Sequence, residues 1–362
     1  MHSAPFLTGC AVSLMSSCSG GSGTASGEGV LPGESATYGD EGELIDPIPF
    51  QEIGGVSVGN AQDDKAKTGV TVFYFPAGAT ASAVVLGGGP ASREVPLLDP
   101  ARNTPPLDAL VFGGGSAHGL AASDGVVACI EENGKGYDTG YGLVPIVCQS
   151  DIFDLSYGDG SVRPDRKMGY LACERAMKGN SPQSGNIGAG TGATVGKPDG
   201  MLTSQKSGIG YAAAKIGDLK VGVAAVVNAL GDIYKDGVKI GGMTTPDRKG
   251  FADASSAILR NQYHDLITGN TTLVAVFTNA DFTVADLQKV ADMASAGMPR
   301  AIRPVFTMAD GDTVYALSVG EEKVSSDVNT VGVLASIIVE KAIADAVQSS
   351  RISEEEFLRN VR

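Results

Sequence analysis

Histidine and tryptophan are scarce in this sequence of 362 residues, which has three histidines and no tryptophan. A serine or cysteine hydrolase relay needs a well-placed histidine, and so does a histidine-rich metal site. His118 follows Gly114-Gly115-Ser116-Ala117, so it stands where a nucleophile elbow needs its second glycine. His2 lies at the start of the sequence, and His264 has no recognisable motif around it. The sequence therefore argues against a histidine-based triad and a metal centre, and we expect no cofactor.

Cysteine is also scarce, and no two cysteines have the C-x-x-C spacing. After Cys10 and Cys18 come only Cys129, Cys148 and Cys173, an odd number that allows at most one disulfide. Cys129 and Cys173 fall in helix-like apolar patterns, so neither is a good candidate for a nucleophile. We expect all three to be buried free thiols.

Basic runs and long hydrophobic runs are missing as well. The formal charge is -14, which argues against nucleic acid or anionic lipid as a partner. Aromatic residues make up 6% of the chain, while 50 glycines indicate close backbone packing rather than a stacking platform for bases. After the first 30 residues, no segment approaches the roughly 18 uninterrupted apolar residues of a membrane span.

Residues 1–30 differ in composition from the rest of the chain. A short apolar stretch at residues 6–15 is followed by Ser16-Ser17-Cys18 and a Ser/Gly-rich tether, which resembles a lipoprotein leader. No lysine or arginine precedes the apolar stretch, however. Two interpretations stay open: an exported, lipid-anchored or periplasmic protein, or a cytoplasmic protein with a disordered tail.

Residues 31–362 indicate a single catalytic domain of the α/β class, without a clear linker or internal repeat. Alternating or continuous apolar segments predict strands at residues 70–75, 83–86, 220–228 and 272–278. Apolar spacing close to 3.6 residues predicts helices after Ser116 and at residues 166–177 and 252–260.

The C-terminal part has clearer boundaries. Thr283 and Asp286 have the spacing of a capping box, so a helix should begin there and end near Gly297. Asp310-Gly311 is a hairpin signal, and it lies between two predicted strands, residues 303–307 and 313–319. A last helix is predicted at residues 329–347, with one apolar face formed by Val331, Leu334, Ile338 and Ala342.

The segment Gly269-Asn270-Thr271-Thr272 runs directly into the predicted strand. A cut before Thr271 would leave one residue carrying both a hydroxyl nucleophile and a free α-amino group. An α-amino group titrates near pH ~7.7 to 8.0, so at neutral pH a useful fraction is unprotonated and able to take the hydroxyl proton. On these four residues alone, a simple turn entering a strand is the more common explanation.

Two glycine-rich stretches invite a nucleotide-binding interpretation, and both fail on spacing. Residues 188–197 end in Gly196-Lys197, but a phosphate loop needs glycine where Thr191 stands and a hydroxyl residue where Pro198 stands. Gly87-Gly88-Gly89-Pro90 fails because proline breaks the turn-to-helix geometry of a dinucleotide fingerprint. Without further context, Lys197 would be expected on the solvated surface.

Four motifs that occur in this order along the chain favour a catalytic site over a simple turn and a surface lysine. They are Gly185-Asn186-Ile187-Gly188-Ala189-Gly190-Thr191-Gly192, Val227-Asn228, Gly269-Asn270-Thr271-Thr272 and Asp310-Gly311-Asp312-Thr313. Together they resemble the self-cleaving aminopeptidase/amidase family, which includes L-aminopeptidase/D-amidases, β-peptidyl aminopeptidases and 6-aminohexanoate-oligomer endohydrolases, or nylon hydrolases. The nylon hydrolases are the most similar in pattern, and the resemblance spans residues 50–347.

The resemblance implies roles for individual residues. Thr271 matches the N-terminal nucleophile, which self-cleavage after Asn270 sets free. Lys197 matches the lysine that lies by the nucleophile and tunes its protonation, because a nearby cation lowers the cost of an alkoxide-like oxygen. Asn228 matches the asparagine whose amide helps to stabilise the oxyanion.

Three further positions complete the comparison. Asp310 and Asp312 match the acidic pair that hydrogen-bonds around the threonine. Phe153 is a departure: nylon hydrolases have tyrosine before an Asp-aromatic pair, whereas this chain has Phe153-Asp154-Leu155. A hydroxyl donor is thereby lost at a position that the resemblance assigns to substrate binding.

The resemblance also implies a fold and an activity. The fold would be a four-layer αββα sandwich of the N-terminal-nucleophile-hydrolase type, cut into residues 31–270 and 271–362 and assembled as a homo-oligomer, commonly a tetramer. The activity would be hydrolysis of linear amides, such as 6-aminohexanoate oligomers, polyamide (nylon) or related peptides.

Other activities stay open. The exopeptidase relatives, β-peptidyl aminopeptidase and L-aminopeptidase/D-amidase, are one alternative. A threonine-dependent acyltransferase is another, although that class cuts at Ala-Thr-Met-Leu rather than Gly-Asn-Thr-Thr. A third is a self-processing protein without turnover.

Overall fold

The computed structural model describes residues 44–103, 105–260 and 269–362. The candidate leader at residues 1–30 lies outside these ranges, and so does His264. Within the described ranges, no helix is long and apolar enough to cross a lipid bilayer.

A ten-stranded sheet runs through the fold, and its strand β3 (Thr68–Val85) is long enough to belong to both halves of it. The first half consists of β1 (Asp46–Pro47), β11 (Ile209–Ile216), β12 (Leu219–Asn228), β15 (Thr271–Thr278), β17 (Thr313–Ser318) and the end of β3. The second half consists of the start of β3, β2 (Ser57–Asp63), β5 (Leu107–Gly113), β8 (Val147–Asp151) and β4 (Ala91–Arg93).

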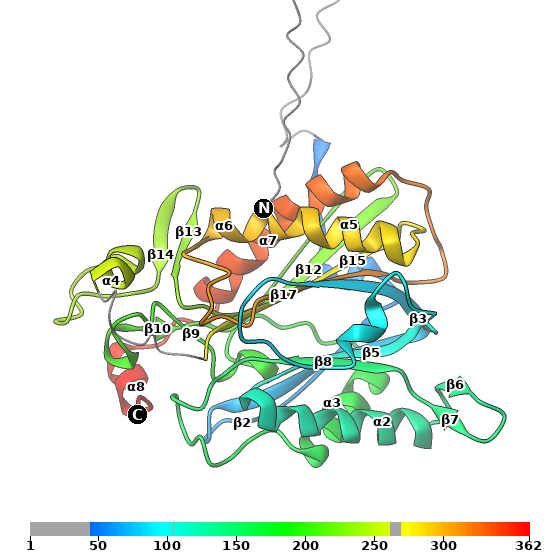
Figure 1. Ribbon diagram of the computed structural model, residues 1–362, viewed down its shortest axis with the longest axis horizontal. Helices are drawn as coiled ribbons and strands as arrows, with labels where there is room; N and C mark the ends of the chain where they lie inside the picture. The colour runs from blue at the N-terminus through cyan, green and yellow to red at the C-terminus, as the bar shows by residue number, and fades with distance from the viewer. Residues whose placement is uncertain (1–43, 104, 261–268) are drawn as a thin grey trace, which may run out of the picture. The chain divides into compact units, whose positions relative to one another are not determined.

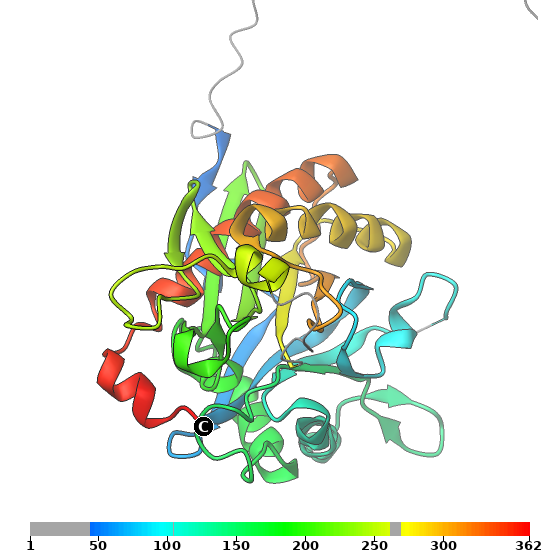
Figure 2. The ribbon, with the colours of Figure 1, turned by 60° about the vertical axis from the view of Figure 1, so that its left-hand side comes forward.

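Helices cover the outer face of each half, as both views show (Figures 1 and 2). The first half carries α5 (Val284–Ser295), α6 (Gly297–Ala301) and α7 (Val328–Gln348). The second half carries α2 (Ala122–Glu132) and α3 (Arg166–Lys178). The layers therefore follow the order helix, sheet, sheet, helix, and the predicted αββα sandwich is confirmed.

Smaller elements extend the first half on the side of the C-terminus. They are β9 (Thr194–Val195), β10 (Gln205–Lys206), β13 (Asp232–Lys235), β14 (Val238–Gly241), β16 (Ile302–Arg303), α4 (Ala254–Arg260) and α8 (Glu354–Arg359). A short hairpin of β6 (Tyr137–Asp138) and β7 (Leu143–Val144) follows α2.

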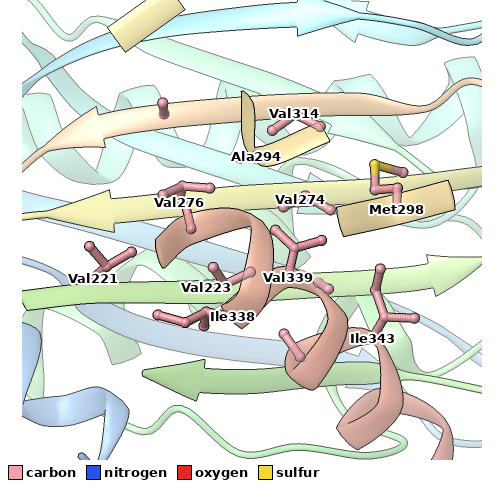
Figure 3. Packing of buried hydrophobic residues seen from close by; sticks show 14 of the residues in the cluster. Val221, Val223, Val274, Val276, Ala294, Met298, Val314, Ile338, Val339 and Ile343 are labelled. Carbon is pink, nitrogen blue, oxygen red and sulfur yellow. The ribbon is translucent and has the colours of Figure 1, made fainter. Parts of the chain in front are cut away.

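Alternation along the central strands explains why these layers form. Val274 and Val276 of β15 face α5 and α7, where they join the cluster drawn in Figure 3. Leu273, Ala275 and Phe277 face the other sheet half. Since successive strand residues point to opposite faces, a strand that is apolar at every position is suited to burial on both sides.

Aromatic rings fill the space between the two sheet halves. Phe277 of β15 lies with its ring centroid 5.3 Å from that of Phe73 in β3 and 5.5 Å from that of Phe50. The ring centroid of Phe112 in β5 lies 5.9 Å from that of Tyr315 in β17. These contacts join residues far apart in sequence and hold the two halves face to face.

Most of the predicted elements are confirmed. Strands β12 and β15 and helices α3, α4 and α7 lie within two residues of the predicted bounds. Thr283 and Asp286 form the capping box at the start of α5. The strands predicted at 70–75 and 83–86 are one strand, β3, and the helix after Ser116 begins as a 3-10 turn before α2.

The predicted hairpin around Asp310-Gly311 is wrong. Strand β17 pairs in parallel with β15 and antiparallel with β3, whereas β16 pairs with β13. The Asp310-Gly311 segment is held instead by bonds to the chain before β15, since Gly311 N donates to Asn270 O at 2.8 Å. These bonds place the segment at the edge of the sheet where β15 begins.

The cysteine prediction is confirmed for the described residues. Cys129 in α2, Cys148 in β8 and Cys173 in α3 are free and buried. Burial raises the pKa of the Cys148 thiol to about 12, which keeps it in the unreactive protonated form.

We predict that Phe277→Ala destabilises the fold by about 3–5 kcal/mol, because the vacated volume lies between rings that cannot close over it. The free energy of unfolding from urea titration measures the loss. Tyr141→Ala removes a ring of similar size that is fully exposed, and it should leave the midpoint nearly unchanged. Equal losses in the two variants would contradict the assignment of Phe277 to a close-packed core.

Candidate active site

Thr271 begins strand β15 and lies directly opposite Asn228, the last residue of the antiparallel strand β12. Its side chain is buried, with 3% of the residue exposed. The start of β17 lies on the other side, because Leu273 pairs with Thr313 in the parallel ladder. Three chain segments therefore meet at one edge of the sheet.

The peptide bond between Asn270 and Thr271 is held from several directions. Asn270 N donates to Ala309 O at 3.1 Å, and Gly311 N donates to Asn270 O at 2.8 Å. Thr272 N donates to a carboxylate oxygen of Asp312 at 2.6 Å. The Thr271 hydroxyl donates to the Asn270 carbonyl oxygen, so the hydroxyl lies beside the carbonyl group that it would have to attack.

Glycine is required around this bond because backbone fills the space. A Cβ on Gly311 would lie 2.7 Å from Thr271 Oγ1 and 2.8 Å from Gly89 O. A Cβ on Gly87 would lie 2.3 Å from Asp310 O, and Gly89 N donates to that same oxygen at 2.8 Å. The stretch Gly87-Gly88-Gly89, which fails as a nucleotide motif, thus packs against the segment that holds the Asn270 carbonyl.

Lys197 and Asn228 are in direct contact. Lys197 Nζ donates to the backbone oxygen and to Oδ1 of Asn228, each at 2.9 Å. Thr194 N donates to the same Oδ1 at 3.0 Å, and Asn228 Nδ2 donates to Phe153 O at 2.8 Å. The orientation of the Asn228 amide is thereby fixed, and its nitrogen keeps one further hydrogen to donate.

Lys197 is buried, with 2% of the residue exposed, contrary to what the isolated Gly-Lys pattern suggests. Burial lowers its pKa from 10.5 to about 7, and the carboxylates of Asp310, Asp154 and Asp312 oppose that shift. Near neutral pH this amine therefore exchanges a proton easily, which is a property expected of a group in an active site.

Asp310 and Asp312 are buried beside the Asn270–Thr271 bond and accept hydrogen bonds from backbone amides. Asp310 accepts from Leu230 N at 3.3 Å and from the backbone and hydroxyl of Thr307. Asp312 accepts from Phe306 N at 2.9 Å in addition to Thr272 N.

The two carboxyl groups have raised pKa values. Burial is the main cause for both, and the neighbouring Asp310 adds to the shift of Asp312, whose pKa rises to about 7. Like charges close together disfavour full ionisation, so the pair holds a proton more readily than a solvated pair would.

Phe153 lies beside Gly269, the residue before Asn270. A Cβ on Gly269 would lie 2.5 Å from Cγ of the Phe153 ring, and Gly269 has a φ of +103°, which favours glycine. The ring is half-buried. Its position is compatible with a wall of the site, while its backbone oxygen holds Asn228.

Asp154 and Thr194 also belong to the site, although no sequence motif predicts a role for them. Asp154 is buried, accepts from Thr68 Oγ1 and Gly115 N at 2.7 Å each, and has a pKa raised to about 6, chiefly by burial. Its charge acts on Lys197. The only available signal was the position of Asp154 after Phe153, and nothing in the sequence singled out Thr194.

The family model described as Peptidase family S58 matches residues 50–355, most of the chain. The chain belongs to peptidase family S58. Relatives include an uncharacterized aminopeptidase of Mycobacterium leprae, 39% identical over 70% of this chain and 71% of the relative. A 6-aminohexanoate-oligomer endohydrolase of Kocuria sp. is 29% identical over 88% of this chain and 94% of the relative.

A solved structure shows the same fold. The L-aminopeptidase D-Ala-esterase/amidase from Ochrobactrum anthropi, a variant of the Ntn hydrolase fold, matches with a TM-score of 0.62 and 16% identity. The match covers 87% of this chain and 91% of that chain. The predicted family and fold are confirmed, and this S58 member is an amide-bond hydrolase.

We predict a pH-dependent contribution of Lys197 to the stability of this S58 protein. Between about pH 7 and 10.5 the folded protein keeps Lys197 neutral while the unfolded chain protonates it. The unfolded state then binds more protons, so the free energy of unfolding rises with pH in this window. Lys197→Met removes the effect. The difference between wild type and variant should grow by up to about 1.4 kcal/mol per pH unit from about pH 7.5 to 9.5.

Denaturant titrations at several pH values measure that difference. Lys178→Met, which replaces a lysine of α3 whose side chain is 72% exposed, is the control and should give a difference that does not change with pH. A constant difference for Lys197→Met would contradict a lowered pKa.

Proposed function

We propose that this chain cuts itself between Asn270 and Thr271 and that the freed Thr271 is the nucleophile of the hydrolase. The observation that carries the proposal is the arrangement at the bond itself. The Thr271 hydroxyl lies against the Asn270 carbonyl oxygen, and Gly311 N donates to that oxygen. An N–H aimed at the oxygen where negative charge develops lowers the barrier to attack.

The cut would proceed as an N-to-O acyl shift. Thr271 Oγ1 forms a bond to the Asn270 carbonyl carbon and gives up its proton, and the C–N bond to Thr271 then breaks as its nitrogen takes a proton. Water hydrolyses the resulting ester, which leaves a carboxylate on Asn270 and a free amine on Thr271. The buried carboxyl group of Asp312, whose pKa is raised to about 7, is suited to hold or release a proton near neutral pH, and burial raises the pKa of the neighbouring Asp310 as well.

In the cut enzyme, the α-amino group of Thr271 would take the proton of its own hydroxyl as the substrate carbonyl is attacked. Lys197, with its pKa near 7, would tune the proton balance around the nucleophile. Asn228 would donate its remaining amide hydrogen to the oxyanion, because its Oδ1 is already held by Thr194 and Lys197.

Linear amides that lack a free α-ammonium group beside the scissile bond are the substrates we propose, as exemplified by 6-aminohexanoate oligomers, polyamide and related peptides. A 6-aminohexanoate-oligomer endohydrolase is among the relatives. An exopeptidase needs a carboxylate free to hold the substrate amine. Of the described carboxylates at the site, Asp154, Asp310 and Asp312 each already accept at least two hydrogen bonds.

Aminopeptidase activity is the second candidate, because the relative of highest identity reported above carries that name. Assays of 6-aminohexanoate oligomers, β-peptides and aminoacyl amides with the purified protein separate the two. Preferred release of single N-terminal residues would replace the endo-acting proposal. Transfer of the acyl group to an added amine, rather than to water, would indicate an acyltransferase, and no turnover of any amide would indicate a self-processing protein without enzymatic activity.

The resemblance to the family implies a homo-oligomer. We propose that it is a tetramer of cut α/β pairs. Light scattering coupled to size-exclusion chromatography measures the mass in solution. A monomer at working concentration would rule this assembly out.

We predict that Thr271→Ala abolishes the cut, because the variant lacks the attacking oxygen. Denaturing electrophoresis should show two chains for the wild type and one for the variant, and N-terminal sequencing of the shorter wild-type chain should begin at Thr271. Thr272→Val is the matched control, since it removes a neighbouring buried hydroxyl that has no hydrogen-bond partner among the described residues, and it should still be cut. A single uncut chain from active wild-type protein would contradict self-cleavage before Thr271.

We predict that Phe153→Tyr raises kcat by about two- to tenfold, since a hydroxyl placed at the edge of the site adds one hydrogen bond in the transition state. The half-buried ring beside Gly269 leaves room for solvent at part of its surface, so stability should be unchanged. Melting temperature and kcat are measured on the same preparation. A lower melting temperature with an unchanged rate would remove Phe153 from the site.

A further inference from the structure

Lys206 in β10 is a second buried lysine near the candidate site, and the family resemblance gives it no role. Only 7% of the residue is exposed. Its Nζ donates to three backbone oxygens: Gly190 O at 3.2 Å, Ala193 O at 2.9 Å and Ser207 O. Two of these oxygens belong to the glycine-rich loop that precedes β9.

One peptide plane connects Lys206 to Asn228. The carbonyl oxygen of Ala193 and the N–H of Thr194 belong to the same planar peptide group. Lys206 Nζ holds the oxygen of this group, and its N–H donates to Asn228 Oδ1 at 3.0 Å. Because the group is rigid, a tilt at the Ala193 oxygen turns the N–H away from Asn228.

The backbone supports this plane without replacing Lys206. Ser207 N also donates to Ala193 O at 3.0 Å, and Lys206 pairs with Thr194 where β10 lies against β9. A carbonyl oxygen has two lone pairs, so the two donors act together and fix the direction of the plane. Removing one of them leaves the peptide group tethered but holds its direction less firmly.

We propose that Lys206 is a positioning residue, which orients the Asn228 amide through the Ala193–Thr194 peptide group and so keeps the amide aimed at the reacting carbonyl. The proposal rests on the role of Asn228 in the proposed function. It deepens that function by assigning the orientation of the oxyanion donor to a residue that does not touch the substrate.

The three acceptors around Lys206 Nζ favour an ammonium group at this position, whereas burial of the side chain acts against its charge. Three carbonyl acceptors around one nitrogen require three N–H donors, which an ammonium has and a neutral amine lacks. Burial lowers the pKa of Lys206 well below its usual range and Lys67 lowers it further, whereas Asp154 and Glu356 raise it. Hydrogen bonds to the charged form also favour that form. The Tyr157 ring, with its centroid 5.7 Å from Nζ, adds a favourable contact for a cation.

The test is Lys206→Met, assayed for hydrolysis of a p-nitroanilide amide by the purified, full-length protein. We expect kcat to fall about tenfold or more, because the oxyanion donor is no longer aimed, while KM changes less than about twofold. The wild type is the reference for the proposed function: no hydrolysis by the wild type would overturn that function, whereas wild-type kcat in the variant would overturn only the role of Lys206.

Lys239→Met is the matched control for burial. Lys239 is also largely buried and donates to two backbone oxygens, Met243 O at 3.1 Å and Ala252 O. It differs from Lys206 in forming an ion pair with the buried Asp232 at 2.7 Å, so its loss should cost at least as much stability, and it makes no contact with the Ala193–Thr194 peptide group. We expect both variants to lose melting temperature and only Lys206→Met to lose kcat. An equal loss of kcat in the two variants would mean a general structural effect and would overturn the proposal.

A double variant tests the path through Asn228. If Lys206 acts through this residue, then Lys206→Met should have little further effect on kcat in an Asn228→Ala background. Multiplicative effects would overturn the path. Should Lys206→Met fail to fold, Lys206→Arg replaces it. The guanidinium keeps the positive charge, but its N–H donors lie in one plane and point in other directions than those of an ammonium group. Lys206→Arg is then expected to lower kcat with little change in KM, and unchanged kcat would overturn the proposal.

Discussion

The parallel pairing of β15 with β17 is the contact on which the site depends. Because parallel strands start at the same edge of a sheet, the residues before each strand meet there: Asn270 before β15 and Asp310-Gly311-Asp312 before β17. The antiparallel neighbour β12 ends at this edge and contributes Asn228.

This edge of the sheet holds an unusual amount of buried charge. Lys197, Asp154, Asp310 and Asp312 are all nearly inaccessible, and burial shifts each pKa toward the neutral form. Backbone amides and hydroxyl groups donate hydrogen bonds to the carboxylates, and the nearby glycines let the backbone approach closely. The unfavourable desolvation brings the pKa values of Lys197 and Asp312 to about 7 and that of Asp154 to about 6, and perturbed values of this kind are typical of catalytic sites.

Much of the architecture could be predicted from the sequence because the central elements have strong local signals. The capping box at Thr283, the apolar face of α7 and the apolar run at residues 273–277 within β15 each specify their own structure. The pairing of β17 could not be read in this way. Asp-Gly is a good hairpin signal locally, and long-range bonds from Gly311 and Asp312 override it.

The candidate site was predicted in part. Thr271, Lys197, Asn228, Asp310 and Asp312 were named from motifs, and the structure brings them together, while their chemical roles stay predictions. Other groups act through their backbone: Gly311 and Thr194 contribute N–H groups and Ala193 contributes an oxygen. Side-chain patterns carry no information about such contacts, so they emerge only when the chain is folded.

The place of β15 in the sheet has a consequence for the energetics of a cut chain. β15 lies between β12 and β17 and packs on both faces, so a cut before Thr271 leaves both products locked in one core. Unfolding of the uncut chain is unimolecular, but reassembly of two separated pieces depends on their concentration. After hydrolysis of this single bond, the persistence of the folded state would be kinetic rather than an equilibrium property. Its lifetime would be set by the activation barrier to removing β15 from the sheet.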